Sequence, residues 1–386
     1  MDSLNMQEKQ VGILRYLSDT EGIKGSIKQT PDDFIVCEIT PEGTVLKPGK
    51  NETFEDKGGD YTHFTLEKRD WNTMRAVSEI SKRVGVSRKR FKFAGTKDRK
   101  ALTVQRVSAW KVSKENLEKV RLKDIELRDF SKSDEPVNLG CLQGNYFMIN
   151  IDGVEEGLKR TKSIVKELDG KVPNFFGLQR FGNRLNNHIV GRKLLKGSLE
   201  EAAMEFLCGG RENEENENAR EAREAFEKSR DVKGALNDFP NYLGYEKSVL
   251  NHLAVVPTDY AGALRRLPKK LRWMFVHAYQ AYIFNHALSR HIKEGNAPEE
   301  LPLVGSESAV DDTTAQILLD EDIKKEEFEI KPMPELSSKG EFRRSFITFK
   351  EFKAEDLNPA TQKIRVSFKL GKGSYATSVL REFMKN

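Results

Sequence analysis

One carboxylate stands alone in the most basic stretch of the chain. Residues 81–111 contain eleven Lys and Arg residues, and Asp98 is the only acid among them. Lys97 and Arg99 flank it, between a short aromatic run and a longer alternating run that predict two strands. Reactive side chains are often displayed on connections carried by a rigid sheet, so we expect Asp98 on such a turn.

The surroundings of Asp98 admit two interpretations. The cations on either side would favour the ionised carboxylate, which could then serve as a nucleophile or a base. A basic run is also typical of a solvated or phosphate-binding face, in which a single acid is an ordinary ion-pair partner. The local sequence is equally compatible with both.

A family resemblance favours the first interpretation. Ala94 to Gln105 reads A-G-T-K-D-R-K-A-L-T-V-Q. It resembles the catalytic loop of the TruD family of RNA pseudouridine synthases, whose pattern is G-x-K-D-[RK]-x-A-x-T-x-Q. Leu102 departs from it, since the family more often has valine there. The resemblance implies that Asp98 is the catalytic aspartate and that Lys97 contributes to substrate binding.

A second match lies in the strand predicted at the end of residues 26–39. Its alternation puts an aromatic and an acid, Phe34 and Glu38, on one face, a mixture that suits a surface facing a site. The alternation alone is also compatible with Phe34 being a residue of the hydrophobic core. In TruD-like sequences a lysine six positions before this phenylalanine lies near the aspartate. The resemblance therefore implies that Lys28 and Phe34 bind substrate.

The strand predicted at Asn145–Ile151 provides a third match, because Gly144 to Phe147 resembles the family's N-x-F element. The resemblance implies that Phe147 stacks on the target base with Asn145 beside it. Stacking returns roughly 1 to 3 kcal/mol per base when a base leaves its helical stack. A phenylalanine at the start of a strand is more often a core residue, and the pattern alone favours that role.

Two further matches follow in the family's order. Residues 173–182 fit the signature P-N-[YF]-F-G-x-Q-R-F-G, which opens the insertion of TruD proteins, and Arg180 there can reach a phosphate or pair with a carboxylate. We expect Arg180 to bind substrate by organising the cleft. Near the C-terminus, residues 373–382 resemble G-S-[YF]-A-T-x-V-x-R-E, and Ser374 is the expected N-cap of a final helix.

Helical patterns account for much of the remaining chain. Thr73–Val84 has helical apolar spacing and stops before Gly85, and a short helix is predicted at Leu199–Cys208 with Ser198 as its cap. Residues 211–230 predict an exposed helical face. Residues 269–292 predict a core helix, with an apolar stripe made of Leu271, Met274, Phe275, Ala278, Tyr282, Ile283 and Leu288.

Composition sets the broad class. With 386 residues, a net charge of +5 and a pI near 8.8, the chain has room for two or three domains, and its basic cluster suits a polyanion. Three scattered cysteines predict neither a disulfide framework nor a zinc site, and His277, His286 and His291 lack partners at ligand spacing. No apolar run approaches about 18 residues and no signal-peptide core is present, so we expect no membrane contact and a cytoplasmic location.

The resemblance also implies the architecture. The expected class is α+β. A pseudouridine synthase catalytic domain would comprise residues 1–171 and 346–386, with an antiparallel sheet flanked by helices. A largely helical, TruD-specific α/β domain would be inserted at residues 172–345.

The implied activity is the isomerisation of uridine to pseudouridine in tRNA, with uridine 13 of the D arm as the leading site. Asp98 would attack C1′ or take a proton from the sugar, and both are open; retaining glycosidases use a carboxylate beside a breaking glycosidic bond. No metal, nucleotide or redox cofactor and no obligate protein partner is implied. The rival hypothesis is a non-catalytic RNA-binding protein in which Asp98 is an ion-pair residue. A metal-dependent nuclease would need clustered acids that the basic run lacks.

Overall fold

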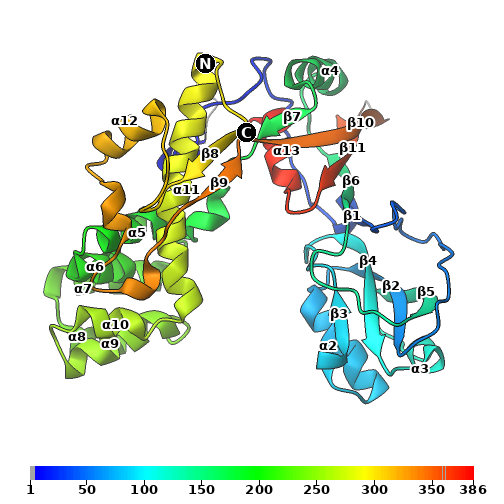
Figure 1. Ribbon diagram of the computed structural model, residues 1–386, viewed down its shortest axis with the longest axis horizontal. Coiled ribbons are helices and arrows are strands. Elements are labelled where there is room, and N and C mark those ends of the chain that lie inside the picture. The colour runs from blue at the N-terminus through cyan, green and yellow to red at the C-terminus, as the bar shows by residue number, and fades with distance from the viewer. Residues whose placement is uncertain (1–4, 359, 361) are drawn as a thin grey trace. The chain divides into compact units, whose positions relative to one another are not determined.

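The computed structural model describes residues 5–358, 360 and 362–386. The chain forms two compact units (Figure 1). The sheet unit comprises Ser18–Val172 and Ile347–Asn386, and the helical unit comprises the chain up to Leu17 together with Pro173–Phe346. The N-terminal segment thus groups with the helical unit, whereas the sequence-based division placed it in the other domain. The predicted α+β class is confirmed.

Nine strands form the large sheet of the described residues, in the order β5-β2-β4-β1-β6-β11-β10-β7 with β3 paired to β4. Pairing is parallel between β1 and β4, so the sheet is mixed where an antiparallel one was expected. The chain reaches β4 from β1 through β2, a helix and β3, a crossover long enough for parallel pairing. The strands are β1 (Phe34–Ile39), β2 (Tyr61–Arg69), β3 (Phe91–Phe93), β4 (Leu102–Trp110), β5 (Ile125–Ser133), β6 (Gly144–Ile151), β7 (Lys171–Pro173), β10 (Phe346–Asn358) and β11 (Lys363–Gly371).

Strand register gathers the predicted site residues on one face of this sheet, called here the site face. Directly opposed residues in neighbouring strands point to the same side. Val36 of β1 is opposite Phe147 of β6 and Thr103 of β4, and Phe147 is in turn opposite Phe368 of β11. The site face therefore runs across five strands, and it includes Phe34, Glu38, Lys68, Gln105 and Asn145.

Helix α2 (Thr73–Val84) has the predicted bounds. It begins where the Asn72 side chain accepts hydrogen bonds from two backbone N–H groups, and it ends at Gly85, whose φ of 73° is left-handed. Val77 and Ile80 pack with Phe64 and Val107 in the core beneath it. The other helices of the sheet unit are α3 (Lys114–Glu118), α4 (Gly157–Leu168) and α13 (Ala376–Met384).

The predicted cap of α13 is wrong. Tyr375 occupies the N-cap position, and its side chain makes no capping hydrogen bond. Ser374 instead belongs to the preceding turn, where its N–H donates to the Gly371 carbonyl at 3.3 Å.

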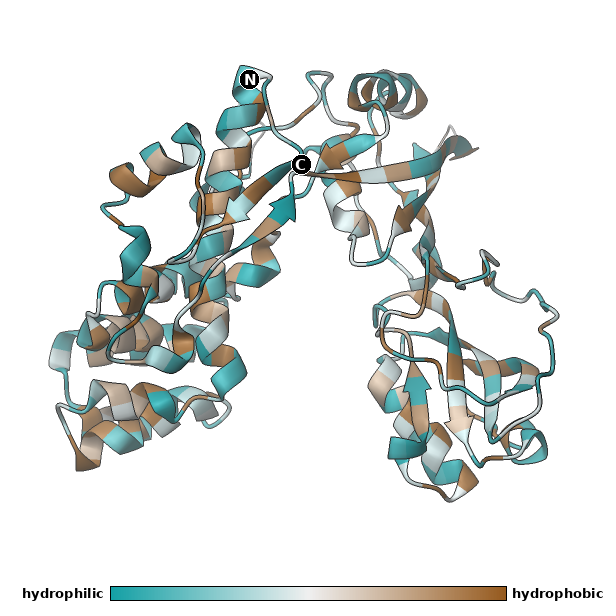
Figure 2. Ribbon diagram, in the orientation of Figure 1, coloured by the Kyte–Doolittle hydropathy of each residue, from teal (hydrophilic) through white to brown (hydrophobic). Residues whose placement is uncertain are grey.

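The helical unit is built around α11 (Lys269–Glu294), whose residues alternate between hydrophobic and hydrophilic along its length (Figure 2). Phe275, Ala278, Ile283 and Leu288 are buried as predicted, whereas Met274 is exposed. The other helices of this unit are α1 (Met6–Gln10), α5 (Asn187–Leu195), α6 (Leu199–Cys208), α7 (Glu217–Ser229), α8 (Val232–Asp238), α9 (Gly244–Val255), α10 (Tyr260–Arg265) and α12 (Asp312–Asp320), and β8 (Glu300–Leu303) pairs with β9 (Glu341–Arg344) in a small sheet. Helix α6 has its predicted bounds, although Ser198 makes no side-chain cap.

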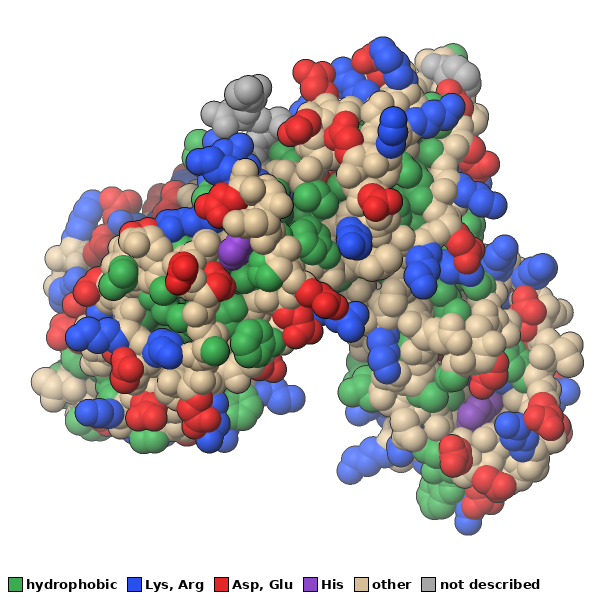
Figure 3. Space-filling view, turned by 45° about the horizontal axis from the view of Figure 1, so that its top comes forward, with side chains coloured by type: hydrophobic (Ala, Val, Ile, Leu, Met, Phe, Trp, Pro, Cys, Tyr) green, Lys and Arg blue, Asp and Glu red, His purple; other side chains and the backbone are tan. Residues whose placement is uncertain are grey.

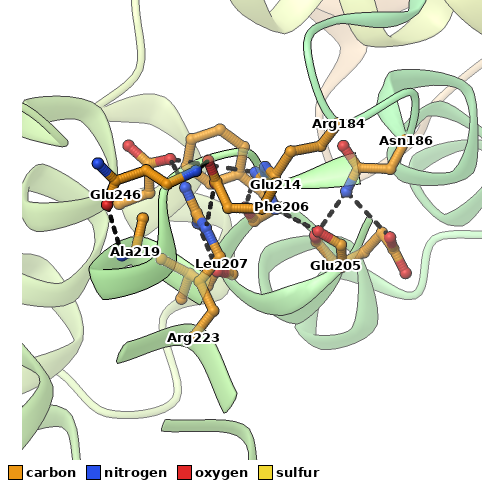
Figure 4. A network of polar contacts seen from close by, with 11 residues as sticks. Arg184, Asn186, Glu205, Phe206, Leu207, Glu214, Ala219, Arg223 and Glu246 are labelled. Carbon is orange, nitrogen blue, oxygen red and sulfur yellow. Dashed lines mark hydrogen bonds and ion pairs between the residues drawn. The ribbon is translucent and has the colours of Figure 1, made fainter. Parts of the chain in front are cut away.

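The segment 211–230 is not merely an exposed face. Arg223 of α7 is 1% exposed, and its guanidinium donates to the Leu207 carbonyl and pairs with Glu246 at 2.8 Å and Glu214 at 3.2 Å (Figure 4). A buried charge requires such partners. Some of the Glu and Arg residues of this stretch, such as Glu214 and Arg223, therefore belong to a buried polar network.

Charged side chains of both signs are mixed over the face of the molecule shown in Figure 3, with small green apolar areas between them. Within the described part of the chain, no helix has both the length and the hydrophobicity that crossing a bilayer requires.

Candidate active site

Asp98 lies on the connection between β3 and β4, residues 94–101, called here the Asp98 turn. Two buried side chains support it from below. Gln105 of β4 donates from Nε2 to the Gly95 carbonyl at 2.9 Å and accepts from the Thr73 hydroxyl at 3.2 Å. The Thr73 hydroxyl also accepts from the Lys97 N–H at 3.0 Å. The turn is therefore attached to both β4 and α2.

Lys97 points away from Asp98, into the sheet unit. Its Nζ lies 2.8 Å from Glu38 Oε2 and donates to Asn145 Oδ1 at 2.8 Å. The side chains of Lys97 and Glu38 are 5% and 1% exposed. Arg99 turns outward toward Asp70, at 3.7 Å. The expectation that these two flanking cations stabilise the Asp98 carboxylate is therefore wrong, because adjacent side chains on this turn diverge.

The cation beside the Asp98 carboxylate is Lys28. Its Nζ lies 3.8 Å from Asp98 Oδ1 and 4.0 Å from the centre of the Phe34 ring. Lys28 adopts a left-handed backbone conformation, with φ of 60°, just before β1. The Asp98 side chain is 50% exposed, so its oxygens are not buried against a lysine or an arginine. A carboxylate in this setting is accessible to a ligand.

Lys68 of β2 is a contributor that the sequence reasoning missed. It is fully buried, and its Nζ donates to the backbone carbonyl of Asp98 at 2.8 Å. Burial lowers the pKa of Lys68 to about 8, although the charge of Asp98 opposes this shift. The alternation in β2 indicates that Lys68 is buried, because it lies on the same strand face as the apolar residues Phe64 and Leu66.

Three phenylalanines form the aromatic part of the site face. Phe34 is 1% exposed and meets Phe147 edge to face, with ring centres 6.3 Å apart. Phe147 stacks on Phe368 at 5.5 Å and is 5% exposed. The Phe147 ring is enclosed because β6 lies between β1 and β11, where Phe34 and Phe368 flank it; its stacking on the target base stays a prediction. Phe368 was not singled out from the sequence.

Arg180 belongs to the helical unit, on the 3-10 helix η3 (Leu178–Phe181). Its guanidinium carbon lies 5.1 Å from the centre of the Phe176 ring. Arginine stacked on an aromatic ring keeps its donors free to pair with an anion in the plane of the guanidinium.

Two of the α11 histidines have local contacts, His291 with polar side chains and His286 with the Tyr282 ring. His291 contacts Asn296 at 2.9 Å and Asp311 at 3.3 Å, and burial lowers the pKa of His286 to about 4. Across residues 5–358, 360 and 362–386, no group of three or more His, Cys, Asp or Glu side chains is arranged to hold a metal ion.

Comparison with known proteins identifies the family. The sequence matches the family described as "tRNA pseudouridine synthase D (TruD)" over residues 10–302 and 289–383. The chain belongs to the tRNA pseudouridine synthase D family. A "Probable tRNA pseudouridine synthase D" of Methanosarcina acetivorans is 36% identical over 437 aligned residues, which cover 98% of this chain and 96% of that protein.

Two other comparisons agree. The Thermococcus onnurineus "Probable tRNA pseudouridine synthase D" is 43% identical over 310 residues, which cover 78% of this chain and 68% of that protein. The crystal structure of a tRNA pseudouridine synthase D (TruD) candidate from Methanosarcina mazei superposes with a TM-score of 0.89 at 35% identity, covering 100% and 99% of the two chains.

This TruD-family chain is a tRNA pseudouridine synthase, an isomerase, and the predicted family and enzyme class are confirmed. Of the residues predicted for the site, Lys28, Phe34, Lys97, Asp98, Asn145 and Phe147 come together in the sheet unit. Their individual roles stay predictions.

Proposed function

We propose that this TruD-family enzyme converts uridine 13 of the tRNA D arm to pseudouridine, with Asp98 acting at the sugar carbon C1′ or as a base toward the sugar. The observation that carries the proposal is the accessible Asp98 carboxylate, 3.8 Å from the Lys28 ammonium on the aromatic site face. The site couples an available anion with an adjacent cation beside buried aromatic side chains.

The reaction is an isomerisation and needs no co-reactant. The bond between N1 and C1′ breaks, the uracil turns within the site, and a bond forms between C5 and C1′. The proton on C5 then leaves for solvent, and N1 is protonated. Asp98 either forms and later breaks a bond to C1′, or takes and returns a sugar proton. In both cases the carboxylate must be ionised and must reach the nucleoside.

The neighbouring residues divide the work of binding. Lys28 orients the Asp98 carboxylate, Lys97 and Asn145 fix the Asp98 turn against the sheet, and Phe34 and Phe147 support the uracil from below. Arg180 pairs with a phosphate of the tRNA. The sheet unit is the catalytic domain, and the helical unit is the insertion that recognises the rest of the tRNA.

Tritium release from tRNA labelled at C5 of uridine tests the proposal. We expect Asp98→Asn to abolish release while tRNA affinity stays within about threefold, since the side chain keeps its shape but loses its charge. The matched control is Asp70→Asn, because Asp70 is a nearby exposed carboxylate paired with Arg99. Retained release in Asp98→Asn would refute the assigned role.

The target position and the chemical role need separate measurements. A transcript with cytidine in place of uridine 13 should release no tritium, and release at the wild-type rate would place the target elsewhere. Deuterium at the sugar C2′ should slow single-turnover conversion if Asp98 takes that proton. The rate should be nearly unchanged if Asp98 attacks C1′.

A further inference from the structure

Leu139 is the most exposed of the large hydrophobic side chains in the described residues, at 86%. It stands at the tip of a turn in which the Cys141 N–H donates to the Asn138 carbonyl at 3.0 Å. Gly140, the third residue of this four-residue turn, has a φ of 79°, a left-handed value that glycine adopts without strain. The exposed side chain is available to a partner, and removing its apolar surface from water on contact would be favourable.

The turn is held firmly on both sides of Leu139. On one side the Val137 N–H donates to the Ser108 hydroxyl at 3.0 Å, and Val137 itself is buried. On the other side the Gly140 N–H donates to the Ala94 carbonyl at 2.8 Å. The side chain therefore projects from an ordered backbone, and little backbone conformational entropy remains to be lost when it meets a partner.

The bond from Gly140 ties the turn that carries Leu139 to the Asp98 turn. Ala94 begins the Asp98 turn, and Asn145, six residues after Leu139, contacts Lys97 of that turn at 2.8 Å. The segment carrying Leu139 is thus attached to the Asp98 turn at two points. A nucleotide that reaches the Asp98 carboxylate would have its neighbouring bases close to this tip.

The charges around the tip suit a polyanion. Lys92 is exposed on one side, where its carbonyl accepts from the Ser108 hydroxyl, and Lys372 is exposed on the other, where its N–H donates to the Gln143 carbonyl at 3.1 Å. Residues 138–144 contain no acid. An apolar tip between two lysines fits bases flanked by phosphates.

We propose that Leu139 is a wedge that enters the base stack of the RNA and fills the space left by the target uridine as it turns toward Asp98. This inference rests on the proposed function and adds a residue to it. Extruding a base costs stacking energy, and apolar side chains inserted between base steps stabilise the opened state in other nucleic-acid complexes. Leu139 is a substrate-binding residue in this account and takes no part in bond making.

The test compares RNA substrates that differ in how much stacking must be broken. With Leu139→Ala, we expect single-turnover conversion of folded tRNA to slow by about tenfold. We expect the rate to be unchanged on a short unstructured RNA carrying the same uridine. Leu139→Met should stay close to wild type, and Leu319→Ala, a truncation at another exposed leucine, should have no effect.

A second readout reports base extrusion directly. A tRNA with 2-aminopurine beside the target uridine should brighten on binding wild-type protein and on binding Asp98→Asn, and should stay dim with Leu139→Ala. If wild-type protein brightens the probe but forms no pseudouridine, the proposed catalytic function is refuted and the base-extruding role of Leu139 is still supported.

Three outcomes would overturn the wedge. Wild-type rates for Leu139→Ala on folded tRNA would show that the side chain is dispensable. Equal slowing on folded and unstructured RNA would show a structural role. A change in oligomeric state, measured by sedimentation, with no change in the fluorescence readout would show that the leucine covers a protein contact instead.

Discussion

At the scale of single residues, the site depends on which cations are left near the Asp98 carboxylate. Lys97 is paired with Glu38 and Arg99 with Asp70, so the two cations next to Asp98 in sequence bind other carboxylates. Lys28 supplies the adjacent charge from a segment far earlier in the chain. This leaves one cation beside an accessible carboxylate, enough to orient it without burying it.

Removing that cation should slow the reaction. We predict that Lys28→Met lowers the single-turnover rate at saturating tRNA by about tenfold or more, because Lys28 is the cation that pairs with the Asp98 carboxylate oxygen. Lys100→Met, at an exposed lysine of the same turn, is the control and should leave the rate within about twofold. Equal effects of the two substitutions would point to general attraction of tRNA.

Lys68 predicts a pH dependence. Burial holds its pKa at about 8, below the roughly 10.4 of an unfolded chain. The ammonium therefore persists below about pH 8 and is lost above it in the folded protein. Between these values the unfolded chain binds more protons, so this group adds to stability as pH rises. The catalytic rate should respond in the opposite direction, because deprotonation of Lys68 removes the positive charge beneath Asp98.

We expect the single-turnover rate of the wild-type protein to fall as pH rises through about 8. Lys68→Met should be slower at neutral pH and should lack this step, because methionine fills the space without a proton to lose. The measurement is a rate profile from pH 6 to 10. A step near pH 8 that survives in Lys68→Met would assign it to another group.

At the scale of elements, a buried cluster joins β1, β6 and the Asp98 turn. Glu38 accepts from the Arg106 N–H at 3.0 Å through one oxygen and pairs with Lys97 through the other. Lys97 extends the link to Asn145. The turn is thus fixed to two central strands by a largely buried ion pair and a hydrogen bond.

This cluster predicts a non-additive pair of substitutions. Lys97→Met should cost about 3 to 5 kcal/mol of unfolding free energy, because it leaves the Glu38 carboxylate buried without its cation. Adding Glu38→Gln should recover much of that loss, while the rate stays low because the turn remains detached from Asn145. Urea unfolding and single-turnover assays measure the two effects.

The exposed pair Lys82 and Glu79, 2.7 Å apart on α2, provides the control. Its double substitution to Met and Gln should change the unfolding free energy by less than about 1 kcal/mol. A double variant of the buried pair that is no more stable than Lys97→Met alone would contradict the account.

Local patterns sufficed for several elements. Apolar spacing and a stop at Gly85 gave the bounds of α2, and alternation located β1, β2 and β6. The basic run with its single acid singled out Asp98. The missed features depend on contacts between distant segments, which composition and spacing do not encode. Lys97 turns to Glu38, and Phe368 covers Phe147, because strand order brings them together.

At the scale of the whole molecule, the part of the helical unit that interrupts the sheet unit in sequence, Pro173–Phe346, has two ends that meet. The Asn174 N–H donates to the Ser345 carbonyl at 2.8 Å, where the chain leaves the sheet unit and returns to it. Strands β7 and β10, which carry these ends, are neighbours in the large sheet. An insertion with adjacent ends can be removed with little strain on its host.

We predict that Ser18–Val172 joined to Ile347–Asn386 by a short Gly-Ser linker folds cooperatively and keeps the mixed sheet. Its affinity for tRNA should fall by at least about tenfold, because the surface of the helical unit is lost. Thermal unfolding followed by circular dichroism and a tRNA binding titration test this. Loss of the cooperative transition would show that the sheet unit depends on the insertion for its stability.

The pairing of β6 with β11 has a consequence for biosynthesis. Ile151 is opposite Ile364, so one edge of β6 stays open on the ribosome until a strand 213 positions later has been translated. At typical elongation rates that wait lasts roughly ten to forty seconds, during which an unpaired apolar edge invites aggregation. A premature stop codon anywhere before β11 should therefore yield an insoluble product, and no shorter nascent chain can contain a finished active site.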